Sequence, residues 1–151
     1  MNDLIKQRVI RQRYLNSYLA ELNHLFSINI SDNNLQSLEF TRNHIERIHQ
    51  MNKALIYTES LPFSQREQLK EILINNNFLL EKPYYFWAIH SDSCGLLAVP
   101  SMECFNWSFD FDIDKNGIIV FFDTLFKQEV VIDFYDEREK QIIKIALWGL
   151  E

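Results

Sequence analysis

Glycine, proline and cysteine are all scarce in this chain. Its 151 residues include three glycines, three prolines and two cysteines. So little glycine and proline excludes a collagen-like chain and argues against a disordered one. Two cysteines are too few for a disulfide scaffold, so we expect Cys94 and Cys104 to be reduced thiols, although their spacing does not forbid a bridge.

Long apolar runs are also missing. No run of 18 or more apolar residues occurs, and basic residues interrupt the first segment at Lys6, Arg8, Arg11 and Arg13. A membrane-spanning helix needs about 20 consecutive apolar residues, and a secretion signal needs an uninterrupted apolar stretch. We therefore expect a soluble, cytoplasmic protein without a membrane partner.

Basic residues are few in the second part of the chain. Residues 59–151 carry sixteen acids and eight bases, whereas residues 1–58 carry five acids and seven bases. Ten of the acids lie between Glu103 and Glu139. A surface of this sign repels phosphate backbones and attracts basic proteins, so we expect no nucleic-acid partner.

Apolar residues, in contrast, make up 47% of the chain, which is enough for one domain with a substantial core. We expect a single domain over residues 1–151, with a helical half at 1–80 and a sheet half at 81–151. Helical spacing predicts a first helix from Asp3 to about Phe26 and a second from Leu35 to about Tyr57. A capping box at residues 64–67 predicts the start of a third helix.

Strand patterns follow Pro83. Residues 84–90, 96–99 and 128–135 are expected to be strands, and Asp136 is expected to cap a final helix. The fold class is therefore α+β, with about three N-terminal helices, a four- to five-stranded antiparallel meander and a C-terminal helix.

The stretch from Phe105 to Asp114 alternates strictly between apolar and polar residues. A period of two predicts a strand, and Lys115–Gly117 predicts a turn into a second strand at Ile118–Phe122. We expect Ile113 to pair with Ile118 in this hairpin.

One face of the predicted hairpin carries carboxylates. The expected register places Ile119, Phe121 and Asp123 on the same face as Asp110 and Asp112. Exposed apolar groups surrounded by charge are typical of an interface centre, so this face is a candidate surface for binding a basic protein.

A calcium site is the first competing interpretation of this stretch. The segment from Asp112 to Asp123 has the spacing of most of an EF-hand loop, including Gly117 at the sixth position. Strand patterns flank it, whereas helices flank an EF-hand loop, so we expect a turn and no metal. Elsewhere, His44 and His49 lie five positions apart, which is the wrong spacing for a shared metal on a helix.

A hydrolase is the second competing interpretation. Residues 90–94 place a histidine, an aspartate and a cysteine close together, the residue types of a thiol nucleophile with its base. Members of such sites usually come from distant segments that meet in a cleft, and a turn between two strands offers little of that. The turn interpretation accounts for His90 and Cys94 adequately.

Three segments of the second half, Trp107–Asp112, Gly117–Phe122 and Val130–Asp136, combine aromatic and β-branched residues with carboxylates. In them the chain resembles the bacterial immunity proteins of polymorphic-toxin and contact-dependent growth inhibition systems, over residues 84–148 at most. The resemblance implies a non-catalytic protein that binds one cognate toxin domain tightly, often a nuclease with a basic active site.

We therefore predict a toxin-neutralising protein that is a monomer or a weak homodimer and needs no cofactor. Its expected partner contacts are Asp110, Asp112, Phe121, Asp123, Asp133 and Tyr135. Three alternatives stay open: a small Cys/His hydrolase, a regulatory subunit of a permanent oligomer, and carboxylates that only keep the sheet from aggregating.

Overall fold

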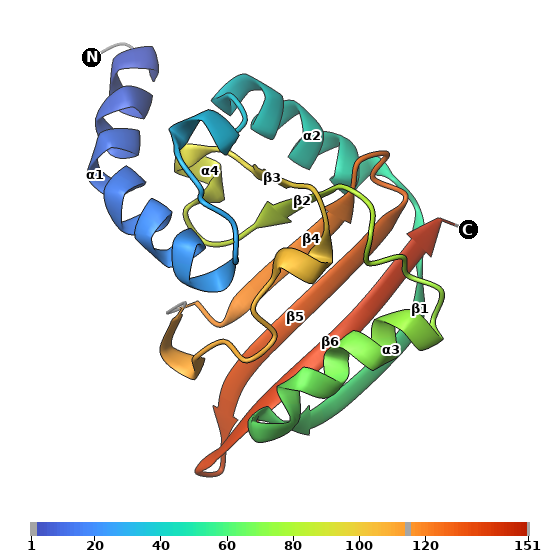
Figure 1. Ribbon diagram of the computed structural model, residues 1–151. Helices are drawn as coiled ribbons and strands as arrows, with labels where there is room; N and C mark the ends of the chain where they lie inside the picture. The colour runs from blue at the N-terminus through green and yellow to red at the C-terminus, as the bar shows by residue number, and fades with distance from the viewer. Residues whose placement is uncertain (1–2, 114–115, 151) are drawn as a thin grey trace.

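A six-stranded antiparallel sheet organises the structure, a computed structural model that describes residues 3–113 and 116–150 (Figure 1). The strand order is β1-β6-β5-β4-β2-β3. The strands are β1 Lys53–Pro62, β2 Tyr84–Trp87, β3 Leu97–Val99, β4 Ile118–Asp123, β5 Gln128–Glu137 and β6 Lys140–Leu150. The helices are α1 Asp3–Leu25, α2 Leu38–Gln50, α3 Leu69–Asn75 and the single turn α4 Ser91–Cys94.

The inner face of the sheet carries the main core. Alternate residues of β4, β5 and β6 point into it, which is the period-two pattern of a strand with one buried face. They are Ile119, Phe121, Val130, Ile132, Phe134, Ile143, Ile145 and Leu147, each at most 3% exposed. Residues of α1, of α3 and of the segment 105–109 pack against them.

The outer face of the sheet is covered only in part. One buried residue of α2, Ile48, packs with Val120, Phe122 and Phe126 in a second, smaller cluster over β4. The outer faces of β5 and β6 lie beyond the end of α2.

Several expected elements are confirmed. The first helix runs from Asp3 to Leu25, and Tyr84–Trp87, Leu97–Val99 and Gln128–Glu137 are strands. The third helix begins at Leu69, later than expected, because residues 63–68 form a 3-10 helix first. The α+β class is confirmed, but with six strands.

The second helix is shorter than expected, and the N-terminal half is not wholly helical. The helix ends at Gln50, and Lys53–Pro62 is the edge strand β1. A bulge between Leu55 and Tyr57 shifts its register against β6 and breaks the alternation that would have identified a strand.

The predicted C-terminal helix is wrong, because residues 140–150 form β6. The prediction came from apolar residues at helical spacing, yet Ile143, Ile145 and Leu147 alternate onto the inner face. Arg138 and Glu139, with φ of 49° and 66°, form the tight turn that pairs β6 with β5. Type I′ turns with φ above zero usually contain asparagine or glycine, so this turn was hidden.

The predicted strand at 105–114 is also wrong. Phe105, Trp107 and Phe109 are buried as the alternation predicted, but the segment is a loop with short helical turns. Strand β4 pairs with β2 and β5 instead, and Ile118 lies opposite Asp133 rather than Ile113. Asp114 and Lys115, in the expected turn, lie outside the described residues.

Candidate functional site

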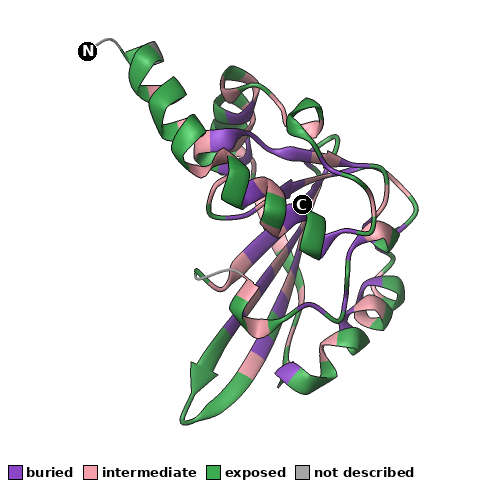
Figure 2. Ribbon diagram, turned by 60° about the vertical axis from the view of Figure 1, so that its left-hand side comes forward, coloured by how far each residue is buried: buried purple, intermediate pink, exposed green. Residues whose placement is uncertain are grey.

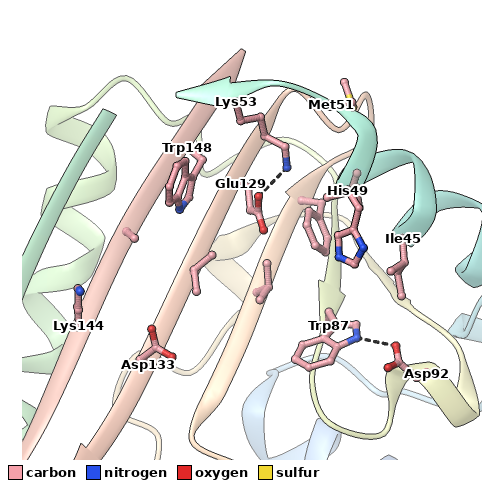
Figure 3. Close-up of a pocket in the computed structure, with 15 residues that line it drawn as sticks. Ile45, His49, Met51, Lys53, Trp87, Asp92, Glu129, Asp133, Lys144 and Trp148 are labelled. Atoms are coloured by element: carbon pink, nitrogen blue, oxygen red, sulfur yellow. Dashed lines mark hydrogen bonds and ion pairs between the residues drawn. The ribbon is translucent and has the colours of Figure 1, made fainter. Parts of the chain in front are cut away.

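A groove of about 700 Å³ crosses the outer face of the sheet beside the end of α2 (Figure 3). We call it the outer groove. Its floor consists of Val120, Phe122, Val131 and Ala146, and its wall of Ile45, Ile48, His49 and Met51. Its rim consists of Lys53, Trp87, Asp92, Glu129, Asp133, Lys144 and Trp148.

Small side chains in one row make the floor hollow. Val120, Val131 and Ala146 lie opposite one another on β4, β5 and β6. Trp87 lies at the β2 end of this row, because it pairs with Val120. Trp148 lies on β6 in the next row, because it pairs with Glu129. A low apolar row between two large rings is what opens the groove.

One ion pair lies at the rim of the outer groove. Lys53 Nζ donates to Glu129 Oε2 at 2.6 Å, and the two side chains are 7% and 19% exposed. The same ammonium group lies 5.7 Å from the centre of the Phe122 ring. A carboxylate and an aromatic ring thus hold a partly desolvated cation here.

A second carboxylate holds a tryptophan at the rim. Trp87 Nε1 donates to Asp92 Oδ1 at 2.9 Å, and Asp92 belongs to the turn α4 (Figure 3). This hydrogen bond connects a ring on β2 to the segment after it. The ring is therefore oriented before any ligand arrives.

The third carboxylate, Asp133, has no such partner. It is half-buried on β5, and Lys144 lies opposite it on β6. Burial raises the pKa of Asp133 above its ordinary value, and the nearby charge of Lys144 opposes that rise. Within residues 3–113 and 116–150, no ion pair or hydrogen bond reaches the Asp133 carboxylate.

Two of the predicted contacts are not available to a partner. Phe121 is 0% exposed in the main core, so the prediction that it lies on an exposed face is wrong. Asp123 is 6% exposed; its Oδ1 accepts from the backbone N–H of Lys127 and Gln128 at 2.6 and 3.1 Å, and its Oδ2 lies 3.6 Å from Lys82 Nζ. Asp123 stabilises the β4–β5 turn instead.

The other predicted contacts fall in two places. Asp133 lies in the outer groove. Asp112 and Tyr135 line a shallow hollow with Asp136 at the other end of β5, and Asp110 is exposed on the same loop as Asp112. We call Asp110, Asp112, Tyr135, Asp136 and Glu137 the acidic end. Its last three residues belong to the β5–β6 hairpin, which is exposed from residue 135 to 141 (Figure 2).

Sequence reasoning missed both tryptophans and the Lys53–Glu129 pair. Trp148 was hidden because its segment was assigned to a helix, although the alternation of residues 142–148 contained the signal. Lys53 was hidden for the same reason. Lys53 and Trp148 lie near Glu129 because of the order of the strands in the sheet, which no local sequence pattern encodes.

The Cys94 thiol is poorly placed for nucleophilic chemistry. It is 0% exposed, burial raises its pKa, and its Sγ lies 3.9 Å from the carbonyl oxygen of Arg11. The His90 ring stacks on Tyr14 at 4.8 Å. Both cysteines are free thiols.

The described residues contain no group of three or more His, Cys, Asp or Glu side chains that could hold a metal. Among the same residues, no helix has the length and apolar character needed to span a membrane. No protein-family model matches the chain, and neither a curated protein nor a solved structure is similar enough to match. Fold and groove define an α+β protein whose antiparallel sheet has one open, charged face.

Proposed function

We propose that this chain is a non-catalytic immunity protein, which binds a cognate bacterial toxin domain through the outer groove and the acidic end. The observation that carries the proposal is the composition of the groove. Its apolar floor lies between two tryptophans and is surrounded by charged side chains. Partly exposed aromatic anchors within a polar rim are typical of the energetic centre of a protein interface.

The charge of the chain supports a basic partner. The chain carries a formal net charge of −6, and the acidic end supplies four carboxylates at the other end of β5. Such a surface accelerates association with a basic protein and repels nucleic acid. A toxin domain with a basic active site has the complementary charge.

The burial of Cys94 favours binding over thiol catalysis. A nucleophilic cysteine needs a lowered pKa and access to substrate, and Cys94 has a raised pKa and no exposure. The described lining of the outer groove contains no serine, threonine or cysteine side chain.

Co-expression tests the proposal. A bacterial strain would express the C-terminal domain of a secreted protein encoded beside this chain, with and without the chain. We expect growth arrest by the domain alone and restored growth with the chain, together with a one-to-one complex on size-exclusion chromatography. Arrest that persists although both proteins are soluble would overturn the proposal.

A further inference from the structure

We propose that the outer groove binds an arginine or lysine side chain of the partner protein, with its cationic group on the Asp133 carboxylate and its aliphatic stem on the valine floor. This inference rests on the proposed function and names the chemistry of the partner's contact.

The first argument is the pairing of the carboxylates in the groove. Asp92 accepts a hydrogen bond from Trp87, and Glu129 accepts one from Lys53. Asp133, alone of the three, has no donor among the described residues. A half-buried carboxylate loses hydration, and the nearby charge of Lys144 offsets that loss only in part, so an external cation that donates hydrogen bonds would stabilise Asp133 further.

The second argument is a repeat within β5. Glu129, Val131 and Asp133 lie on the same face of the strand at a spacing of two residues. At Glu129 the protein supplies its own cation, because Lys53 reaches the carboxylate across the groove. The Asp133 position repeats the carboxylate but not the buried lysine, and Figure 3 shows its side chain apart from the Lys53–Glu129 pair.

The third argument is the surface beside Asp133. Val120 and Val131 form a low apolar row next to the carboxylate. The methylene groups of arginine and lysine bury well against such a row while the charged group stays at a polar site. Trp87, at the β2 end of this row, extends the apolar surface on which the stem can lie.

Lys144 is the internal competitor. It lies opposite Asp133 but is exposed, and no ion pair joins the two. An exposed pair of this kind contributes little, since it costs side-chain entropy and is screened by solvent. A desolvated cation from a partner would gain more, so replacing Lys144 by glutamine should strengthen binding at this site.

The test measures binding of a side-chain probe by NMR. N-acetyl-arginine methylamide is titrated into the ¹⁵N-labelled full chain, and N-acetyl-citrulline methylamide serves as the neutral control of nearly equal shape. We expect saturable shifts at Val131, Asp133 and the Trp87 indole with the arginine probe only. Asp133→Asn should weaken binding about tenfold or more, whereas Glu71→Gln, at an exposed carboxylate on α3 outside both binding surfaces, should not.

The inference would be overturned if the arginine and citrulline probes bind equally well. It would also be overturned if the arginine probe binds Asp133→Asn as tightly as it binds the natural chain. Unchanged amide spectra elsewhere in Asp133→Asn confirm that the variant is folded. The co-expression test separates the two proposals. If the chain binds the arginine probe but does not protect growth, the immunity function is wrong and the arginine site is still supported. If Asp133→Asn protects growth fully, the arginine site is wrong and the immunity function is still supported.

Discussion

Burial of the Asp133 carboxylate makes its ionised form unfavourable in the folded protein. Its pKa is raised by burial, so the native state holds the proton more tightly than the unfolded chain does. The free energy of unfolding should therefore fall as pH rises from the ordinary value of 3.8 through the raised pKa. Asp133→Asn should lack this decrease and be more stable than the natural chain at neutral pH.

Urea unfolding at a series of pH values measures this effect. Asp136→Asn is the control for the removal of one negative charge, because Asp136 is exposed on the same strand. A stability profile of Asp133→Asn that runs parallel to that of the natural chain would contradict the description of Asp133. A residue that destabilises the fold is expected at a binding site.

Cys94 gives a second prediction for a single residue. Its thiol is buried with a raised pKa, so little thiolate forms near neutral pH. We expect iodoacetamide to alkylate the partly exposed Cys104 first in the native protein, and both cysteines equally in denaturant. Mass spectrometry of the modified peptides measures the order. Faster modification of Cys94 in the native protein would revive the hydrolase alternative.

At the scale of elements, the β4–β5 turn depends on Asp123. Asp123→Ala removes an acceptor of two backbone N–H groups and leaves Lys82 without its ion pair. We expect a loss of about 2–4 kcal/mol in the free energy of unfolding. Asp123→Asn keeps an oxygen at the turn and should lose about 1 kcal/mol. Chemical denaturation of both variants measures the difference, and equal losses would show that the turn amides do not need this acceptor.

The β5–β6 turn offers the opposite test, a gain in stability. Arg138 and Glu139 both have positive φ, which costs ordinary residues roughly 1–2 kcal/mol each. Replacing them by asparagine and glycine removes that cost, although glycine also makes the unfolded chain more flexible. The expected net gain is about 1 kcal/mol by thermal unfolding. A loss of stability would contradict the turn conformation.

The elements also show how far sequence patterns predict this fold. Alternation in residues 105–109 predicted correctly which rings are buried, but a loop that packs rings on a sheet shares that alternation with a strand. Residues 142–147 fit both helical and strand spacing, and pairing with β5 and β1 decided for the strand. Burial follows from local pattern, whereas the order of the strands in the sheet depends on residues far away in the sequence.

At the scale of the whole molecule, the two faces of the sheet differ in how far they are covered. The inner face is closed by α1, α3 and the loop that follows β3, and it carries the core. The outer face is left open beyond α2, and it brings Lys53, Trp87, Glu129, Asp133 and Trp148 together from four strands. The acidic end lies at the other end of β5.

The site could be predicted only in part from the sequence, because its residues come together from four strands. The outward direction of Asp133 and Tyr135 followed from alternation along β5. The exposure of Asp110 and Asp112 was predicted from the polar face of a strand, although the structure forms a loop there. Phe121 and Asp123 were placed on the wrong side, because the inner and outer faces of β4 are both apolar and α2 covers the outer one. The tryptophans needed the strand order of the whole sheet.

The most direct test of the central claim fills the outer groove with a new side chain. Val131→Arg places a long cation on the floor, where about 700 Å³ of open space accommodates it. Ile74→Arg is the control, because Ile74 is 55% exposed on α3 and far from the groove lining. Equal thermal stability of the two variants confirms that both are folded.

The measurement is the dissociation constant of each purified variant with the toxin domain, determined by calorimetry. If the partner occupies the outer groove, Val131→Arg should weaken binding about a hundredfold, and Ile74→Arg should leave it unchanged. Binding by Val131→Arg that is as tight as that of the natural chain would contradict the account.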